Sequence, residues 1–305
     1  MTGISPFVRQ NEPDALTVAR AFRRRYTVAG RWRSVRVGTG FVIGTIGVLI
    51  ALLKPSTADY ISAVAAGWIV ISRIVLEPNE SRERRYGATA QELFDTKVFD
   101  LPWSRSVTGA KPAHEDILNW GRKQTEEELH NWYPDTRPAR HPADVMLCQR
   151  ATITWARQDH NLYALILRWG VGVAFAATVV LGVALNLTLG EYLLRLGVPV
   201  LPAGLDVLDI AADSSALTAK KVQLEAEVDA SLTECRSTGE PPTPRACREL
   251  QNGIYWTRLR PGVPNWMYRI TRRGRQQNME EAVRADVESL PPSLRNDPRF
   301  PSTDR

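Results

Sequence analysis

Cysteine and histidine are scarce in this chain. Three cysteines and four histidines occur among 305 residues. No two cysteines form a CxxC pair, and no Cys/His group has the spacing of a zinc site. The cysteines Cys148, Cys235 and Cys247 are also too few for the disulfide framework of a small secreted domain. We therefore expect free thiols, no bound metal and no other cofactor.

Sequence signatures of catalysis are missing as well. The chain has no GxxxxGK[ST] phosphate loop, no GxSxG and no HExxH. His114-Glu115-Asp116 are consecutive, so their side chains cannot share one helical face as metal ligands. Glu92 and Asp95 lie one helical turn apart, but a solvated helical face accounts for this pair more simply than a catalytic site does. The sequence predicts no catalytic residue and no enzyme.

Apolar residues are concentrated in two blocks, and this concentration is hidden by a mean hydropathy of −0.24. Each block holds two segments, and a helix of roughly 20 apolar residues can cross a bilayer. Within each block the loop is short, so the two segments must be antiparallel neighbours. We predict an all-α membrane protein with four transmembrane helices arranged as two hairpins. The predicted spans are Val37–Leu53, Tyr60–Leu76, Tyr163–Leu187 and Glu191–Ile210.

Positive charge marks the cytoplasmic ends of these spans. The first 36 residues contain eight arginines against Glu12 and Asp14, whereas the two short loops contain only Lys54. Both termini and the central segment are therefore predicted to face the cytoplasm of a bacterial inner membrane. No cleavable signal peptide is expected, because the first apolar run begins only near residue 37.

The hydropathy pattern divides the chain into six parts. These are a basic N-terminal arm (1–36), a transmembrane hairpin (37–76), a cytoplasmic helical region (77–162), a second hairpin (163–210), C-terminal cytoplasmic helices (211–290) and a disordered tail (291–305). Cytoplasmic helices are predicted over Ser81–Thr96, Asp116–Asn131, Ala143–Leu162, Ala216–Cys235, Ala246–Leu259 and from Val263 to about Leu290. The helices Ser81–Thr96 and Ala143–Leu162 are expected to continue into spans, and Asp213-Ser214-Ser215 is expected to cap the helix that follows it.

The fourth span is the weakest on hydropathy, because it contains Arg195, Pro199, Pro202 and Asp206. It could instead be a re-entrant or interfacial helix, but an even number of spans keeps the C-terminal cysteines in the cytoplasm. Arg195 follows Glu191 by four residues, which is pairing distance on a helix. The prolines free backbone carbonyls that need protein or water as partners. We predict that this span lines a water-filled path; the alternative is a kinked helix packed inside the bundle.

Other features of the spans have plainer explanations. Arg73 and Arg168 lie near cytoplasmic ends, where their side chains can extend to the membrane surface. Gly40 and Gly44 form a GxxxG motif, which allows close approach of helix backbones in lipid. A stripe of small residues at Gly170, Ala174 and Ala177 can serve the same purpose.

Several short motifs occur in a fixed order along the chain, and as a set they resemble the SMODS-associated four-transmembrane effector family. They begin with Arg85-Tyr86-Gly87-Ala88-Thr89-Ala90-Gln91-Glu92-Leu93-Phe94-Asp95-Thr96 and Asp100-Leu101-Pro102-Trp103. Asn131-Trp132-Tyr133-Pro134 and Cys148-Gln149-Arg150 with Trp155 follow. Leu250-Gln251-Asn252-Gly253-Ile254-Tyr255 with Arg258, and Val263-Pro264-Asn265-Trp266-Met267-Tyr268 with Arg272, complete the set.

The resemblance implies a role in bacterial anti-phage immunity. A neighbouring synthase would supply a cyclic nucleotide, and the effector would then form pores in the inner membrane as a homo-oligomer. Two other interpretations stay open: a membrane-anchored sensor or scaffold that binds a nucleotide or protein partner, and a membrane enzyme using Glu92, Asp95 and Asp100. The lipid bilayer is an expected partner, and nucleic acid is not.

Overall fold

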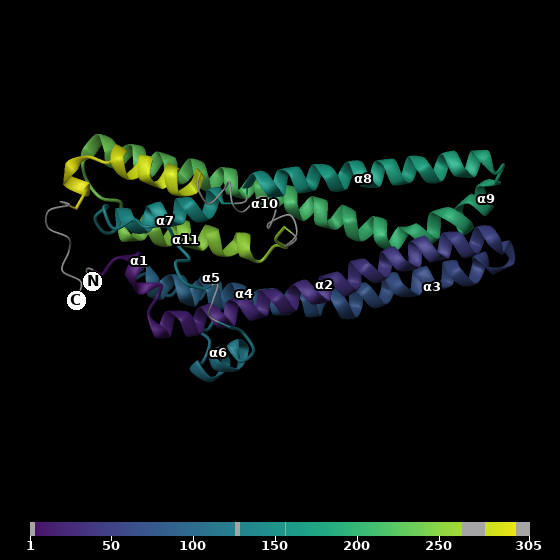
Figure 1. The fold of residues 1–305 in the computed structure, drawn as a ribbon, viewed down its shortest axis with the longest axis horizontal. Helices are drawn as coiled ribbons and strands as arrows, with labels where there is room; N and C mark the ends of the chain where they lie inside the picture. Colours follow the sequence, from purple (N-terminus) through teal and green to yellow (C-terminus); the bar gives the residue numbers. More distant parts are fainter. Residues whose placement is uncertain (1–3, 126–128, 156, 264–277, 297–305) are drawn as a thin grey trace. The chain divides into compact units, whose positions relative to one another are not determined.

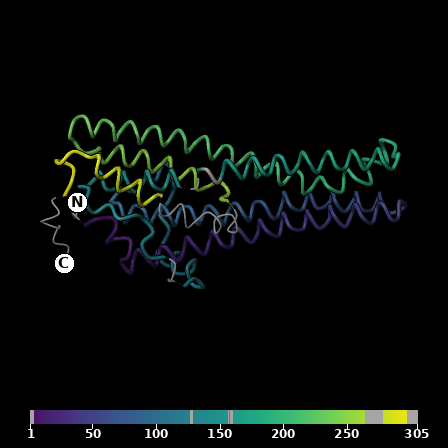
Figure 2. Tube along the Cα trace, turned by 45° about the horizontal axis from the view of Figure 1, so that its top comes forward, coloured from purple at the N-terminus to yellow at the C-terminus, as the bar shows by residue number. Residues whose placement is uncertain are grey.

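The computed structural model describes residues 4–125, 129–155, 157–263 and 278–296. Within these residues the chain forms helices, and its β-structure is a single isolated bridge between Ala139 and Arg295. The predicted all-α class is confirmed. The chain divides into two compact units. Figures 1 and 2 show the helices that make up both units. The first unit comprises Met1–Tyr26, Arg84–His160 and Leu217–Arg305, and the second comprises Thr27–Glu83 and Asn161–Ala216.

The second unit is built from two helical hairpins. In the first hairpin, α2 (Pro13–Leu53) turns through the short helix η1 (Pro55–Thr57) into α3 (Ala58–Ile71). In the second hairpin, α8 (Arg157–Ala184) turns through α9 (Leu189–Tyr192) into a π-helical segment, η3 (Leu193–Gly197). Helix α10 (Val198–Thr238) follows η3 and runs beside α8 (Figure 1). Both predicted hairpins are therefore present in the fold.

Three helical stretches in the described part of the chain are long and apolar enough to cross a membrane. They are Pro13–Leu53, Pro55–Val98 and His160–Ala184. Large apolar side chains cover their outer faces and are exposed in the isolated chain, among them Leu53, Ile74, Trp169 and Val183. Such surface is costly in water and neutral in hydrocarbon, so this is a membrane protein.

Three helices pass between the two units without interruption. Helix α2 does so, and so does α10. The helix that begins with α3 continues through the π-helical segment η2 (Ser72–Leu76) into α4 (Glu77–Val98). The expected continuation of the second span over Ser81–Thr96 is thus confirmed.

The helix of the predicted third span is preceded by a break, unlike those of the other three predicted spans, which continue into the first unit. Helix α7 (Ala143–Thr154) ends at Trp155, whose backbone is extended at φ −56° and ψ 131°, and α8 begins at Arg157. The prediction of one helix over Ala143–Leu162 is therefore wrong. Neither proline nor glycine marks the break, and for this reason the sequence pattern did not reveal it.

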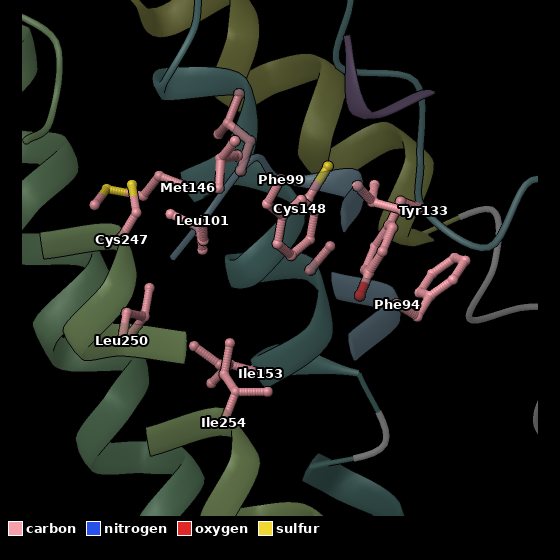
Figure 3. Close-up of a cluster of buried hydrophobic side chains, with 14 of the residues drawn as sticks. Phe94, Phe99, Leu101, Tyr133, Met146, Cys148, Ile153, Cys247, Leu250 and Ile254 are labelled. Carbon is pink, nitrogen blue, oxygen red and sulfur yellow. The ribbon is translucent and has the colours of Figure 1, made fainter. Parts of the chain in front are cut away.

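The first unit packs around one apolar core. Phe22 of α2 places its ring edge-on to Phe94 of α4, with centroids 5.5 Å apart, and to Trp132, at 5.1 Å. Helix α11 (Pro244–Arg258) packs on α7, and Figure 3 shows Ile254 of α11 beside Ile153 of α7. The core also takes Leu224, Val228, Leu232 and Cys235 from α10.

The N-terminal residues are part of this core. The short helix α1 (Pro6–Arg9) precedes α2, and Leu16, Val18 and Phe22 of α2 are buried. Residues 13–36 are therefore helical rather than an extended basic arm. Their arginines lie on the remaining faces of a helix whose apolar stripe contributes to the fold.

Three other predicted elements differ in the structure. Helix α6 (His114–Gly121) ends well before the predicted Asn131. The Asp213-Ser214-Ser215 sequence does not cap a helix, because α10 runs through it and the Ser215 hydroxyl donates back to the Ala211 carbonyl at 3.0 Å. The predicted disorder of 291–305 is wrong for 291–296, where helix η4 (Pro292–Leu294) buries Leu294. The remaining tail residues lie outside the described part of the chain.

Candidate functional site

A buried polar network joins α4 to α11 in the first unit. Glu92 and Asp95 lie one turn apart on α4, and their side chains are fully buried. Arg248, Gln251 and Arg258 lie along one face of α11, which is strongly amphipathic and turns this face inward. Since buried charges need partners, this network determines how α11 can sit on α4.

Each carboxylate has one close arginine, and Arg258 Nη1 also lies 3.9 Å from Glu92 Oε2. Arg248 Nη2 donates to Glu92 Oε1 at 2.5 Å, and Arg258 Nη1 lies 2.6 Å from Asp95 Oδ2. The Gln251 amide nitrogen bridges the two acids, donating to Glu92 Oε2 at 2.9 Å and to Asp95 Oδ2 at 2.5 Å. Two negative and two positive side chains therefore balance in the interior.

A further helix and a loop close the network. The Tyr133 hydroxyl donates to Asp95 Oδ1 at 2.5 Å. The Gln149 amide nitrogen, on α7, donates to Gln251 Oε1 at 3.0 Å and to the Cys247 carbonyl at 2.8 Å. These contacts come from residues up to 159 positions apart in sequence. The network therefore fixes the positions of α4, α7 and α11 relative to one another.

Burial shifts the protonation equilibria of these groups. Burial raises the pKa of Glu92, and the nearby Asp95 charge raises it further, against the opposing effect of Arg248. Burial also raises the pKa of Tyr133 well above its ordinary value, with Asp95 adding to the shift. Burial alone would lower the pKa of Arg258, but the combined effects of Asp95, Tyr133, Tyr26 and Glu92 outweigh it and hold that pKa above its usual range.

A second polar cluster connects α10 to the break between α7 and α8. Lys221 Nζ donates to the Trp155 carbonyl at 2.6 Å. One turn further along α10, Glu225 pairs with Arg157 at 2.5 Å. The next turn pairs Asp229 with Arg150 at 2.9 Å. Arg150 Nη1 also donates to Asp286 at 2.7 Å.

One face of α2 packs closely against α10 in the second unit, and we call this contact the hairpin seam. It comprises Arg36, Gly40, Gly44 and Gly47 of α2, with Pro199, Val200, Pro202, Ala203 and Asp206 opposite. A Cβ atom at Gly44 would lie 3.3 Å from the Pro199 carbonyl oxygen, and one at Gly40 would lie 3.4 Å from the Ala203 nitrogen. Glycine therefore favours this close approach of the two backbones, and a large side chain at either position would separate them.

Ion pairs occupy one end of the hairpin seam. Arg36 lies between Glu80, at 3.2 Å, and Asp206, at 2.5 Å. Arg73 pairs with Glu77 at 2.9 Å and with Asp209 of α10. Both aspartates on this part of α10 therefore meet an arginine from the first hairpin.

Two other arginines predicted to lie in the spans have partners inside the protein. Arg195 Nη2 donates to Glu191 Oε1 at 2.7 Å, as the spacing predicted. Arg168 Nη2 donates to the Ser215 hydroxyl at 2.9 Å. Pro199 has no N–H to donate to a carbonyl of the preceding turn, which is the π-helical segment η3. In that segment the Leu194 carbonyl accepts from the Ser62 hydroxyl at 2.9 Å. Pro199 and Pro202 are buried against α2.

Comparison with known proteins is decisive for the family. A model of the SMODS-associating 4TM effector domain matches residues 7–285. The chain belongs to this family. A protein of Bacillus cereus (strain VD146) named "Probable CBASS effector molecule" is 26% identical over 291 residues, covering 90% of this chain and 94% of that protein. No solved structure matches the chain.

The motif residues that resemble this family converge on the two polar clusters of the first unit. Glu92, Asp95, Tyr133, Gln149, Gln251 and Arg258 belong to the α4–α11 network, and Arg150 and Trp155 belong to the α10 cluster. The others pack around these. Phe94, Leu101 and Pro134 are buried, Trp132 contacts Phe22, Pro102 accepts from Arg248, Trp103 donates to Gly109, and Tyr255 lies 3.4 Å from the Thr89 hydroxyl. Pro264, Trp266 and Tyr268 lie outside the described residues.

Several site residues of this effector were not predicted from sequence. Arg248 precedes Gln251 by about one turn, and this helical spacing could have identified it. Arg36 was counted only as an orientation signal, although Asp206 needed a partner within the membrane. Lys221 has no local sequence signal, because its partner is a backbone carbonyl at a break that the sequence does not reveal.

The three cysteines of the effector should react slowly with thiol reagents in the folded state. All are free and buried, and burial raises the pKa values of Cys148 and Cys235 and raises that of Cys247 to about 12. Because the thiolate is the reactive form, maleimide added at about pH 8 should label none of them until the protein is unfolded in denaturant. Mass spectrometry before and after unfolding checks this, and rapid labelling of native protein would contradict the packing described for α7, α10 and α11.

Proposed function

We propose that this chain permeabilises the bacterial inner membrane as an effector of anti-phage nucleotide signalling. The observation that carries the proposal is the continuity of three membrane helices with the soluble core. Helices α2, α4 and α10 each supply buried residues to the first unit, and the same helices, α4 by way of α3, run through the apolar hairpins. A change of packing in the soluble unit is therefore coupled to helices in the membrane.

The comparisons support the defence role. The family description names an effector domain with four transmembrane helices, and the Bacillus cereus relative is named as a CBASS effector. The signal would be a cyclic nucleotide made by a neighbouring synthase. Its binding must favour one of two states of the soluble unit, because a ligand shifts an equilibrium only through a difference in affinity.

We further propose that all four hairpin helices cross the membrane, with both termini in the cytoplasm. The fourth helix lies antiparallel to α2 along the hairpin seam from Gly47 to Arg36. It therefore covers the same depth as much of the first span. Its charged residues Asp206 and Asp209 are neutralised by Arg36 and Arg73, which lowers the cost of placing them there.

A homo-oligomer accounts best for the opening of a path. Two hairpins are too few to enclose a wide channel within one protomer. The third span also makes few packing contacts inside the protomer, since only 6% of its most apolar stretch is buried. A Cβ atom added at Gly170 or Gly172 of this span would meet no atom within 4 Å, so its small-residue face is open to lipid or to another copy.

Membrane potential tests the proposed function. Bacteria expressing this chain, with and without a co-expressed cyclic-oligonucleotide synthase, are followed with a voltage-sensitive dye. Depolarisation is expected only when the synthase is active, and a synthase lacking catalytic residues is the matched control. An unchanged potential with the active synthase, when immunoblots show the protein in the membrane, would reject membrane permeabilisation.

One observation favours the alternative of an anchored sensor or scaffold. The soluble unit has a surface cavity of about 340 Å³ lined by Ile4, Arg9, Glu12, Asp14, Ala15, Lys97 and Asp100, a volume that suits a small polar ligand. Under this alternative the spans only anchor the chain. Replacing both hairpins with unrelated ones should then preserve phage protection, whereas the pore proposal requires that protection is lost.

A further inference from the structure

The hairpin seam has one continuous register. Along α2, Arg36 faces Asp206, Gly40 faces Pro202 and Ala203, and Gly44 faces Pro199 and Val200 of the antiparallel helix. We propose that the seam, with the Arg36 ion pairs at its end, is a latch that keeps the membrane unit closed until the effector is activated. This inference rests on the proposed function and specifies how it is regulated.

The ion pairs make the closed state strongly favoured. Arg36, Glu80 and Asp206 are only 5%, 2% and 2% exposed. The Arg36 guanidinium therefore contacts two carboxylates that have little access to water. Separating α10 from α2 would leave a buried charge without its partner, which is strongly unfavourable. Glu80 follows the first hairpin and Asp206 belongs to the second. The closed state therefore requires that the two hairpins are in contact.

The rest of the hairpin seam offers little resistance to movement. Its contacts at Gly40 and Gly44 are mainly backbone against backbone, without long side chains interlocked across these two positions. In lipid, such contacts are held by close packing rather than by a hydrophobic driving force. The Arg73–Asp209 ion pair and the Ser62 hydrogen bond to the Leu194 carbonyl also join the hairpins, so α10 can slide or tilt along α2 when these contacts and the Arg36 pairs are broken.

The helices that carry the latch also carry the soluble clusters. Glu80 lies on α4, about three turns before Glu92, and Asp206 lies on α10, about five turns before Glu225. Rotation or translation of either helix in the soluble unit must therefore reach the latch residues through continuous helix. This gives a signal in the soluble unit a direct path to the Arg36 ion pairs.

A charge exchange tests the latch. Arg36→Glu and Asp206→Arg each disrupt the balance of one cation between two carboxylates, and the double variant restores it with the positions exchanged. Each single variant should depolarise cells without any synthase. The double variant should depolarise cells only when the synthase is active. Exposed Arg31→Glu on the same helix is the matched control and should behave as wild type. Single variants that reach the membrane in normal amounts but stay silent without the synthase would overturn the latch.

A cross-link supplies a readout that does not depend on the charges. Cysteines introduced at Gly40 and Ala203 lie within disulfide reach, because a Cβ at Gly40 would be 3.6 Å from the Ala203 Cα. A membrane-permeant oxidant should form the disulfide and prevent depolarisation by this double variant even when the synthase is active. A reductant should restore depolarisation. Cysteines at Gly38 and Ala203 are the control pair, which should not cross-link.

The outcomes separate the two proposals. Efficient cross-linking with undiminished depolarisation would reject the latch while leaving pore formation intact. Absence of the cross-link would reject the hairpin seam itself as a feature of the resting state. If the reduced variant and the wild type both fail to depolarise with the active synthase, the proposed function fails instead.

Discussion

Replacing Arg258 with glutamine should lower the free energy of unfolding by about 3–5 kcal/mol, the usual cost of removing one partner from a buried ion pair. Arg258 is the 2.6 Å partner of Asp95, whose side chain is fully buried. Glutamine brings no charge, so Asp95 would lose its cation and keep only neutral donors such as Tyr133 and Gln251. Chemical unfolding of the detergent-solubilised protein, followed by tryptophan fluorescence, measures the change.

The same helix offers a matched control for this substitution. Arg245 also lies on α11 and also pairs with a carboxylate, Glu249 at 2.8 Å, but its side chain is 87% exposed. Arg245→Gln should leave stability unchanged, since exposed pairs contribute little. Equal effects of the two substitutions would mean that the α4–α11 network is solvated, which contradicts the burial described above.

Glu92→Gln should be milder than Arg258→Gln. Burial and the Asp95 charge raise the pKa of Glu92, so the folded state takes up this proton more readily than the unfolded chain does. The stabilising contribution of a raised carboxyl pKa grows as the pH falls through the folded-state pKa and declines as the pH rises. Glutamine mimics the protonated form, so the variant should lose this pH dependence while keeping an amide that can contact Gln251. Unfolding titrations of the variant and the wild type across the acidic pH range measure the difference.

Substitution of Gly44 by leucine should be the most damaging single change in the membrane unit. Even a Cβ at this position would lie 3.3 Å from the Pro199 carbonyl oxygen and 3.5 Å from the Val200 Cα. Both are backbone atoms, so the helices must separate to admit a larger side chain. We expect a loss of about 3 kcal/mol, the upper part of the usual range for overpacking, because the prolines prevent α10 from adjusting locally.

Gly38 provides the control on the same helix. A Cβ at Gly38 would have no atom within 4 Å, and the residue is exposed. Gly38→Leu should therefore fold normally in the membrane, or slightly better, because leucine is the better helix former. The fraction folded during titration with sodium dodecyl sulfate distinguishes the two variants, and similar curves would show that the hairpin seam does not hold the hairpins together.

The apolar segments and the two hairpins could be predicted from sequence, because the bilayer sets the length and polarity of a span and these signals are local. The GxxxG at Gly40 and Gly44 likewise indicated close packing, and the structure identifies Pro199 and Pro202 as what it packs against. The partners of the charged residues in the fourth span were harder to predict from sequence. Hydropathy treats Asp206 as a cost, and only the fold reveals that Arg36 neutralises it.

Helix boundaries were harder to predict, for two different physical reasons. Ser214 and Ser215 are typical cap residues, yet Ser215 hydrogen bonds to its own helix, which α10 packing keeps intact. The break at Trp155 has the opposite origin, because no proline or glycine marks it. Its carbonyl is held by Lys221, which lies 66 positions away in sequence, and such long-range contacts cannot be inferred from local propensity.

The motif residues were identified by resemblance, but their arrangement follows from the structure alone. Nothing in the local sequence indicates that Glu92 and Asp95 share the amide of Gln251. As isolated residues they match a solvated helical face, which is wrong for side chains with no exposure. The spacing along α11 gives the clue in retrospect, since its inward face carries two arginines that require acids opposite them.

The break at Trp155 gives the third span a distinct mechanical character. A continuous helix transmits torque as well as displacement, so α2, α4 and α10 cannot twist in the membrane without twisting part of the soluble core. The extended residue at the end of α7 ends the helical hydrogen bonding before α8 begins, so no continuous helical backbone carries torque from α8 into the core. Twisting of the third span is resisted there by side chains instead, namely the Arg157–Glu225 ion pair and the Lys221 hydrogen bond to the Trp155 carbonyl.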